Sequence, residues 1–442
     1  MAKIKSPKEV EYLAFEGGGG KGIAFVGALE ALEEREVLPI HVTEHEENQI
    51  KGISGASAGA ITALGVAIGM TSKDFRKVVK EGVTRKGKTV TLADFMDAPR
   101  TGQSRCVNNC KPNTEAVSMT DLIAFLGRVG LSYSMLFKEA GSLKKTLIAL
   151  LPLFLGPVAG AGAAIAGNDM LRRLLPQMES YIINMIFDKG LFPGFAAREF
   201  FTILVNNYLV DKLKKEDYVG VPDASVLGFK QFREYTGIDF VVAGTNVTKG
   251  VPAYFSADVT PDFPVVEAVA ISMNIPFLFK PVRIKGSVTG NKALDERVYH
   301  GLWMDGGTLN NLPLHAFDAK STLKCDQDGE LKPIHPGMLG LRLSPPNSDS
   351  EDAKACKSGG IPIVSVLLES LDTYSLLDYG GDFLSALMYY SEEGQIRTPH
   401  ERDHTIELNT YCLGMTEFSP PEEKTKKPIA DAKKMVETYF AS

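Results

Sequence analysis

The sequence predicts an α/β protein with a mostly parallel central sheet flanked by helices. Two strand–loop–helix units near the N-terminus support this class: residues 11–16 and 23–34 enclose a run of four glycines, and residues 49–54 and 60–68 enclose a second small-residue turn. Further along, an apolar strand at 238–246 precedes a buried helix at 265–274. Strands that alternate with helices are typical of parallel sheets, because each parallel connection needs a crossover.

Composition narrows the class of protein. The chain has 442 residues, 44% of them hydrophobic and 23% charged, which is ordinary for a globular protein with a large core. Its formal net charge of -6 argues against nucleic acid as a partner. The five cysteines lack the spacing of a zinc site, so we expect no metal and a reduced, intracellular setting. The N-terminus has no apolar signal core, which leaves open secretion without a cleaved signal.

The segment Gly55-Ala56-Ser57-Ala58-Gly59 fits the pattern G-x-S-x-G between the strand at 49–54 and the helix at 60–68. This is the context of a nucleophile elbow, in which a strained turn lifts the serine hydroxyl clear of the sheet. Gly55 and Gly59 allow the strand and helix to approach closely. The helix that follows directs its positive end toward Ser57. Alone, the pattern also fits a structural turn that packs a helix onto a sheet.

The glycine run Gly17-Gly18-Gly19-Gly20-Lys21-Gly22 allows three interpretations. Gly17, Gly19 and Gly22 satisfy the dinucleotide pattern G-x-G-x-x-G, although a run of glycines does so almost by accident. A P-loop needs a Ser or Thr after the lysine, which is missing. The elbow downstream favours an oxyanion hole, in which glycine N–H groups face the carbonyl oxygen attacked by Ser57. Three roles are open for Lys21: it orients this loop, it holds a phosphate, or it is only a solvated charge.

A third motif, Asp305-Gly306-Gly307, follows the strand predicted at 299–305. The two glycines permit a tight turn that presents the carboxylate at the end of the strand, at the sheet edge where α/β proteins bind ligands. As a structural alternative, Asp-Gly-Gly is simply a good turn. Further strands are predicted at 337–344 and 404–411, and helical segments at 172–216, 362–390 and 427–440.

Two segments remain ambiguous. Residues 71–88 are basic, which fits either a solvated helix face or contact with anionic lipid head groups. Residues 146–168 carry no charge and are long enough to span a bilayer, but Pro152, Gly156 and Pro157 interrupt them. We favour a buried helical hairpin or a cover over an active site.

Taken in order, the three motifs resemble the patatin-like phospholipases. The pattern from Ala268 to Pro281, which includes Ser272, and the Asn311 and Pro313 that follow Asp-Gly-Gly add to this resemblance, which covers 11–75 and 238–315. The resemblance implies a three-layer α/β sandwich with a Ser57 nucleophile, an Asp305 base and oxyanion donors at Gly18 and Gly19, with Gly17 as a further candidate. It requires no histidine, so His300 and His315, which lie nearest Asp305 in sequence, are not expected to act. Gly20 departs from many relatives, which have another small residue there.

These inferences predict a catalytic domain at 8–442 that contains a helical insertion or cap at 90–235. The expected reaction is hydrolysis of fatty-acyl esters as a phospholipase A or lysophospholipase, without cofactor or metal and therefore active in a chelator. A neutral-lipid lipase or carboxylesterase, a nucleotide-binding enzyme, and an effector that binds membranes or host proteins are the alternatives. We expect a cytoplasmic protein at the membrane periphery, with room for an activating protein partner and for delivery into a host cell.

Overall fold

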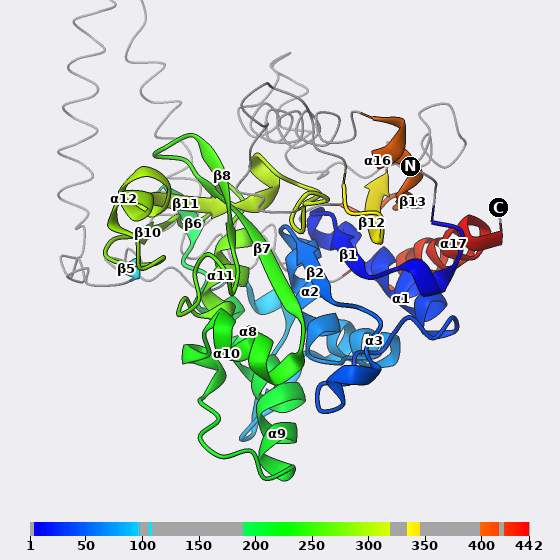
Figure 1. Ribbon diagram of the computed structural model, residues 1–442, viewed down its shortest axis with the longest axis horizontal. Helices are drawn as coiled ribbons and strands as arrows, with labels where there is room; N and C mark the ends of the chain where they lie inside the picture. Colours follow the sequence, from blue (N-terminus) through cyan, green and yellow to red (C-terminus); the bar gives the residue numbers. More distant parts are fainter. Residues whose placement is uncertain are drawn as a thin grey trace, which may run out of the picture.

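The computed structural model describes residues 4–95, 97, 106–107, 189–318, 334–344, 398–414 and 420–441 (Figure 1). The apolar segment 146–168, the helical prediction at 362–390 and most of the predicted insertion lie outside these residues. The division into a domain at 8–442 with an insertion at 90–235 stays a prediction.

The main sheet in the described residues has nine strands. They are β1 (Tyr12–Phe15), β2 (Gly52–Gly55), β5 (Cys106–Val107), β7 (Asp239–Asn246), β8 (Val251–Phe255), β10 (Val282–Ile284), β11 (Gly301–Asp305), β12 (Met338–Ser344) and β13 (Thr405–Asn409). Their order is β13-β12-β1-β2-β7-β11-β10-β5, and β8 pairs with β7. Neighbours from β13 to β7 run parallel, whereas β8 and β11 are antiparallel to β7. Two small pairs join β3 (Val83–Arg85) to β4 (Lys88–Val90), and β6 (Gly190–Phe192) to β9 (Phe277–Phe279).

The described helices agree with the predicted alternation. The α-helices are α1 (Phe25–Glu33), α2 (Ala58–Ala67), α3 (Ser72–Glu81), α8 (Phe195–Val205), α9 (Asp211–Lys215), α10 (Phe229–Thr236), α11 (Val265–Ser272), α12 (Lys292–Leu294), α16 (Pro399–Asp403) and α17 (Glu422–Ala441). Short 3-10 turns lie at η1 (Pro7–Glu9), η2 (Gly19–Ala24), η3 (His45–Glu47), η4 (Leu92–Phe95), η8 (Ala224–Val226) and η10 (Gly306–Thr308), and π turns at η7 (Asn206–Val210) and η9 (Asp295–Tyr299). The mostly parallel α/β fold with flanking helices is confirmed.

Local sequence explains several helix ends. The N-cap of helix α3 is Thr71, whose side chain forms a reciprocal capping box with Asp74. The C-cap of helix α10 is Gly237, whose φ of 69° favours glycine. The first helix begins at Phe25 rather than at the predicted residue 23, because the glycine-rich segment before it forms the 3-10 turn η2.

Alternation along β1 separates the two faces of the sheet. Leu13 and Phe15 belong to the main hydrophobic cluster, which also contains buried side chains of α1, α2, α8, α11 and α17. Ala14 belongs to a second cluster with Leu312 and Leu314, from the segment after η10. Helices therefore cover one face, and residues 309–318 cover part of the other.

Strand β11 reaches the centre of the sheet from the opposite direction to β2. Asp305 pairs in register with Gly244 of β7, two residues beyond Val242, the partner of Gly55 at the end of β2. Because β7 has eight residues and extends past β2, the end of β11 lies beside the turn that follows β2. The Asp-Gly-Gly motif is thereby brought to the edge of the sheet where the sequence predicts it.

Within the described ranges, no helix has the length and apolar character that a bilayer crossing needs.

Cys412, which follows β13, is disulfide-bonded. The expectation of reduced cysteines is wrong at this position, because spacing along the sequence does not show which cysteines meet in space.

Candidate active site

Ser57 sits at the turn between β2 and α2, in the strained geometry of an elbow. Its backbone adopts φ 52° and ψ -125°, a region that non-glycine residues rarely occupy outside functional sites. A Cβ on Gly59 would lie 2.1 Å from the carbonyl oxygen of Phe15, and one on Gly55 would lie 2.4 Å from that of Gly59. The motif glycines are therefore required by the close approach of strand and helix.

The predicted meeting of Ser57 and Asp305 is present. The Ser57 hydroxyl donates to Oδ2 of Asp305 at 2.7 Å, and the N–H of Gly307 donates to Oδ1 at 2.7 Å. Asp305 is 1% exposed, and burial raises the pKa of its carboxyl to about 7, against the lowering effect of these two hydrogen bonds. A carboxylate with such a pKa can act as a base near neutral pH. Position 306 requires glycine, because a Cβ there would lie 2.2 Å from the carbonyl oxygen of Ala243.

The glycine loop lies against Ser57, but its first glycine is not a free donor. The Gly17 N–H donates to the carbonyl of Asn311 at 3.0 Å, which makes Gly17 a weaker candidate for the oxyanion hole than Gly18 and Gly19. Among the described residues, the N–H groups of Gly18 and Gly19 donate no hydrogen bond. Gly19 has a φ of 56° and, like Ser57, borders the pocket described next. Of the three predicted donors, Gly18 and Gly19 are therefore favoured.

The remaining loop residues support this arrangement. The Lys21 N–H donates to the carbonyl of Gly18 at 3.2 Å, while its ammonium group forms no ion pair with the described residues. Gly20 and Gly22 border the pocket, and a Cβ on Gly22 would lie 3.1 Å from that of Ala58.

A deep apolar pocket opens beside Ser57. It encloses about 920 Å³ of space, a figure that includes solvent at its mouth. No charged side chain of the described residues lines it. Its walls come from η2, α1, α2, α3, α8 and the segment after α11, and they include Gly19, Gly20, Gly22, Ile23, Phe25, Val26, Leu29, Ser57, Ala58, Ile61, Thr62, Met70, Phe75, Val78, Val79, Leu92, Phe95, Phe200, Leu204, Met273, Ile275 and Pro420.

Comparison with known families decides the classification. A family model described as patatin-like phospholipase matches residues 13–318, more than half of the chain. The chain belongs to the patatin-like phospholipase family. All three motifs of the proposed site lie within the matched range, as the resemblance predicted.

Individual relatives match shorter segments. The uncharacterized protein YqhO of Bacillus subtilis (strain 168) is 42% identical over 67 residues, which is 15% of this chain and 19% of YqhO. A probable lipid hydrolase, 463L of Invertebrate iridescent virus 6, is 28% identical over 86 residues, 20% of this chain and 25% of that protein. The aligned parts thus span about a quarter or less of these curated relatives.

Two solved structures align over nearly the whole chain at low identity. VipD from Legionella pneumophila is 18% identical with a TM-score of 0.44, and the alignment covers 98% of this chain and 67% of VipD. ExoU from Pseudomonas aeruginosa, solved in complex with SpcU, is 14% identical with a TM-score of 0.37, and the alignment covers 99% of this chain and 54% of ExoU.

Sequence reasoning missed two supports of this patatin-like site. The Ser57 N–H donates to the Ser272 hydroxyl at 2.9 Å, and the Asp305 N–H donates to the Asn274 carbonyl at 3.0 Å. Ser272 belongs to the family pattern between Ala268 and Pro281, but the pattern alone assigned it no role. That pattern was the available signal.

The two histidines nearest Asp305 in sequence are engaged elsewhere. The His300 ring contacts the Gly286 carbonyl at 2.8 Å. The His315 ring bridges Asp318, at 2.6 Å, and Glu401, at 3.0 Å. None of these contacts involves Ser57 or Asp305, so the geometry is that of a serine–aspartate pair.

Proposed function

We propose that the protein is a lipid acyl hydrolase that acts as a phospholipase A or lysophospholipase. The observation that carries this proposal is the 2.7 Å hydrogen bond from a strained, buried serine to a buried carboxylate at the wall of an apolar pocket. A serine hydroxyl needs a base within hydrogen-bond reach to become a nucleophile. The pocket suits a fatty-acyl chain, because its walls are almost entirely apolar.

The reaction takes two steps. Ser57 attacks the ester carbonyl while Asp305 takes its proton, and the N–H groups of Gly18 and Gly19 bind the developing oxyanion. The proton then passes to the leaving alcohol or lysolipid, and the acyl group stays on Ser57. Water, deprotonated by Asp305, attacks this acyl-enzyme, and the fatty acid leaves as the Ser57 hydroxyl is restored. The N–H of Ala58, at the first position of α2, is a further candidate donor.

The residues of helix α3 support phospholipid as the substrate class. Phe75, Val78 and Val79 line the pocket, while Lys73, Lys77 and Lys80 recur at helical spacing on exposed positions of the same helix. A basic helix that also forms a pocket wall suits an anionic membrane from which an acyl chain is drawn. Peripheral membrane attachment, a protein activator and delivery into a host cell stay predictions.

A neutral-lipid lipase or carboxylesterase of the same fold is the second candidate. It is favoured by the pocket lining, which in the described residues offers no charged group to a phosphate. Hydrolysis of phospholipid micelles compared with a triacylglycerol emulsion separates the two candidates.

Active-site labelling tests the proposal. We expect a fluorophosphonate to modify Ser57, and Ser57→Ala and Asp305→Asn each to lower ester hydrolysis by roughly 1000-fold or more while the fold persists. Peptide mapping identifies the labelled residue, and circular dichroism checks the fold. Label on another residue, or an unchanged rate in either variant, would overturn the assignment.

A further inference from the structure

One short segment contacts both Ser57 and Asp305, the two residues of the proposed catalytic dyad. Residues 272–275, here named the bracket, are the last residue of α11 and the three residues that follow the helix. Ser272, which is fully buried, accepts the Ser57 N–H at 2.9 Å through its hydroxyl oxygen. Asn274, 1% exposed, accepts the Asp305 N–H at 3.0 Å through its carbonyl. A backbone contact to each catalytic residue therefore comes from positions only two residues apart.

No strand pairing joins the dyad directly. Ser57 and Asp305 lie 248 positions apart, and the strands that precede them, β2 and β11, each pair with β7 but not with one another. Their relative position depends on β7 and on the bracket. Ser57 also has a strained backbone, and such a conformation persists only where the surroundings enforce it.

The bracket is itself anchored. The Arg198 guanidinium of α8 contacts both carboxylate oxygens of Glu267 in α11 at 2.8–3.2 Å and donates to the Gly194 carbonyl at 2.7 Å. Arg198 and Glu267 are 6% and 8% exposed. A bidentate pair of this kind fixes orientation as well as distance. Helix α11 is thus tied to α8, and the bracket follows at its end.

We propose that the bracket is a positioning device, and that Ser272 is a positioning residue which holds the Ser57 backbone so that its hydroxyl stays within reach of Asp305. The proposal rests on the hydrolase function above. It assigns Ser272 to the rate of attack on the ester and not to lipid binding, since Ser272 is not among the pocket-lining residues.

The test separates rate from binding with a soluble ester. In Ser272→Ala, we expect kcat to fall about 30- to 100-fold while KM stays within about twofold, because misplacement of a reacting group by about 1 Å costs rates of this order. Inactivation by a small fluorophosphonate should slow by a similar factor. Ser272→Cys keeps a side-chain acceptor, although a weaker and somewhat larger one, and its kcat should fall between those of Ser272→Ala and the parent. If Ser272→Ala does not fold, Ser272→Cys provides the test.

Thr236→Ala is the matched control. Thr236 is also fully buried and its hydroxyl also accepts a main-chain N–H, that of Ile238 at 3.2 Å, but it lies at the end of α10. It should lose comparable stability, measured by thermal unfolding, and keep kcat within about twofold. Equal kcat in Ser272→Ala and the parent, or equal losses in both variants, overturns the bracket while the hydrolase function stands. A parent protein that neither hydrolyses esters nor reacts with the fluorophosphonate overturns the function itself.

Discussion

At the scale of single residues, the burial of Asp305 determines the pH at which the dyad can act. Its carboxyl has a pKa raised to about 7 by burial, and only the ionised form accepts the Ser57 proton. We therefore expect kcat/KM to rise with pH up to about 7 and then to level off, with roughly 100-fold lower activity at pH 5 than at pH 8. A pH–rate profile on a soluble ester measures this.

As a control, circular dichroism at each pH checks that the protein remains folded. An aspartate with an ordinary pKa of about 3.9 would stay ionised throughout this range. A flat profile between pH 5 and 8 would therefore contradict the assigned pKa and the role of Asp305 as the base.

The sequence predicts the chemistry of single residues better than their hydrogen bonds. Ser57 and Asp305 could be paired from their motifs, because each motif has a recognisable turn chemistry. The glycine run does not show that the Gly17 N–H donates to Asn311, which lies far along the chain. The contact of Ser272 with Ser57 spans 215 positions, so the pattern around Ser272 points to the residue but not to its partner.

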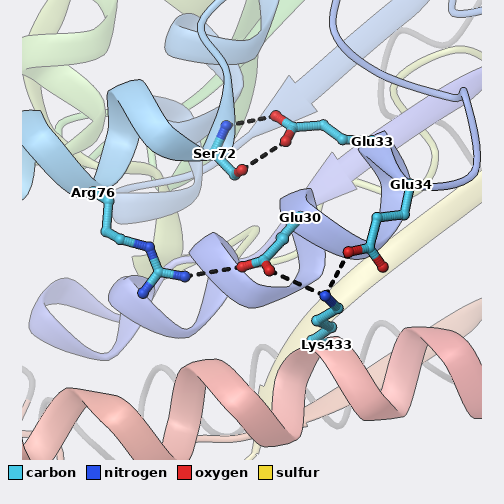
Figure 2. Close-up of polar contacts among 6 residues, drawn as sticks. All are labelled: Glu30, Glu33, Glu34, Ser72, Arg76 and Lys433. Carbon is cyan, nitrogen blue, oxygen red and sulfur yellow. Dashed lines mark hydrogen bonds and ion pairs between the residues drawn. The ribbon is translucent and has the colours of Figure 1, made fainter.

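At the scale of elements, the docking of α17 onto α1 combines charge and close fit. Figure 2 shows Lys433 of α17 between Glu30, at 3.0 Å, and Glu34, at 2.6 Å. In the same view Arg76 reaches Glu30 from α3, at 2.9 Å. The ion pairs are partly exposed, so water and salt screen them and each contributes little to stability.

Close fit should matter more than charge at this contact. A Cβ on Gly27 of α1 would lie 1.8 Å from the Ile429 carbonyl oxygen in α17, so the helices must separate to admit it. We expect Gly27→Ala to lower the free energy of unfolding by about 1–3 kcal/mol, and Lys433→Met to lower it by less. Urea denaturation measures both. A larger loss in Lys433→Met than in Gly27→Ala would contradict this order.

Element types could be predicted, whereas strand directions could not. The apolar segments 238–246 and 299–305 were assigned as strands from composition and turn signals. That β11 is antiparallel to β7 depends on the path of the chain between them, which includes β8 and β10. Neither of these short strands was predicted, because three to five residues show too little periodicity.

At the scale of the whole molecule, His315 links two distant parts of the chain. It lies in the segment 309–318, which covers part of one face of the sheet, and its ring contacts Glu401 of α16. Burial alone would lower its pKa, but hydrogen bonds to Asp318 and Glu401 raise it to about 9. A pKa raised above the unfolded value gives stability that is complete below about pH 6.5 and is lost as pH rises through about 9. We expect this contribution to be on the order of 2 kcal/mol.

Urea midpoints at pH 6, 8 and 10 test this link. The parent protein should lose stability across the range, and His315→Gln should be less stable at pH 6 and depend less on pH. Because tyrosines also titrate near pH 10, the comparison with His315→Gln isolates the histidine. An identical pH dependence in both proteins would show that the His315 contacts do not contribute.

The charge distribution of the whole molecule gives the last prediction. The chain carries a net charge of -6, yet Lys73 and Lys77 are exposed on α3 and form no ion pair with the described residues. Each lysine near an anionic membrane contributes about 1 kcal/mol, so Lys73→Gln/Lys77→Gln should weaken binding to phosphatidylserine vesicles roughly 30-fold. Added salt should weaken the parent's binding as well.

Two lysines on α17 provide the control for the α3 surface. Lys426→Gln/Lys434→Gln removes the same charge from exposed positions of another helix and should leave vesicle binding within about twofold. All these variants should hydrolyse a soluble ester at the parent rate, because none of the four lysines lines the pocket. Equal losses of vesicle binding in both double variants would assign the effect to net charge, and no loss in either would leave the α3 lysines as a solvated face.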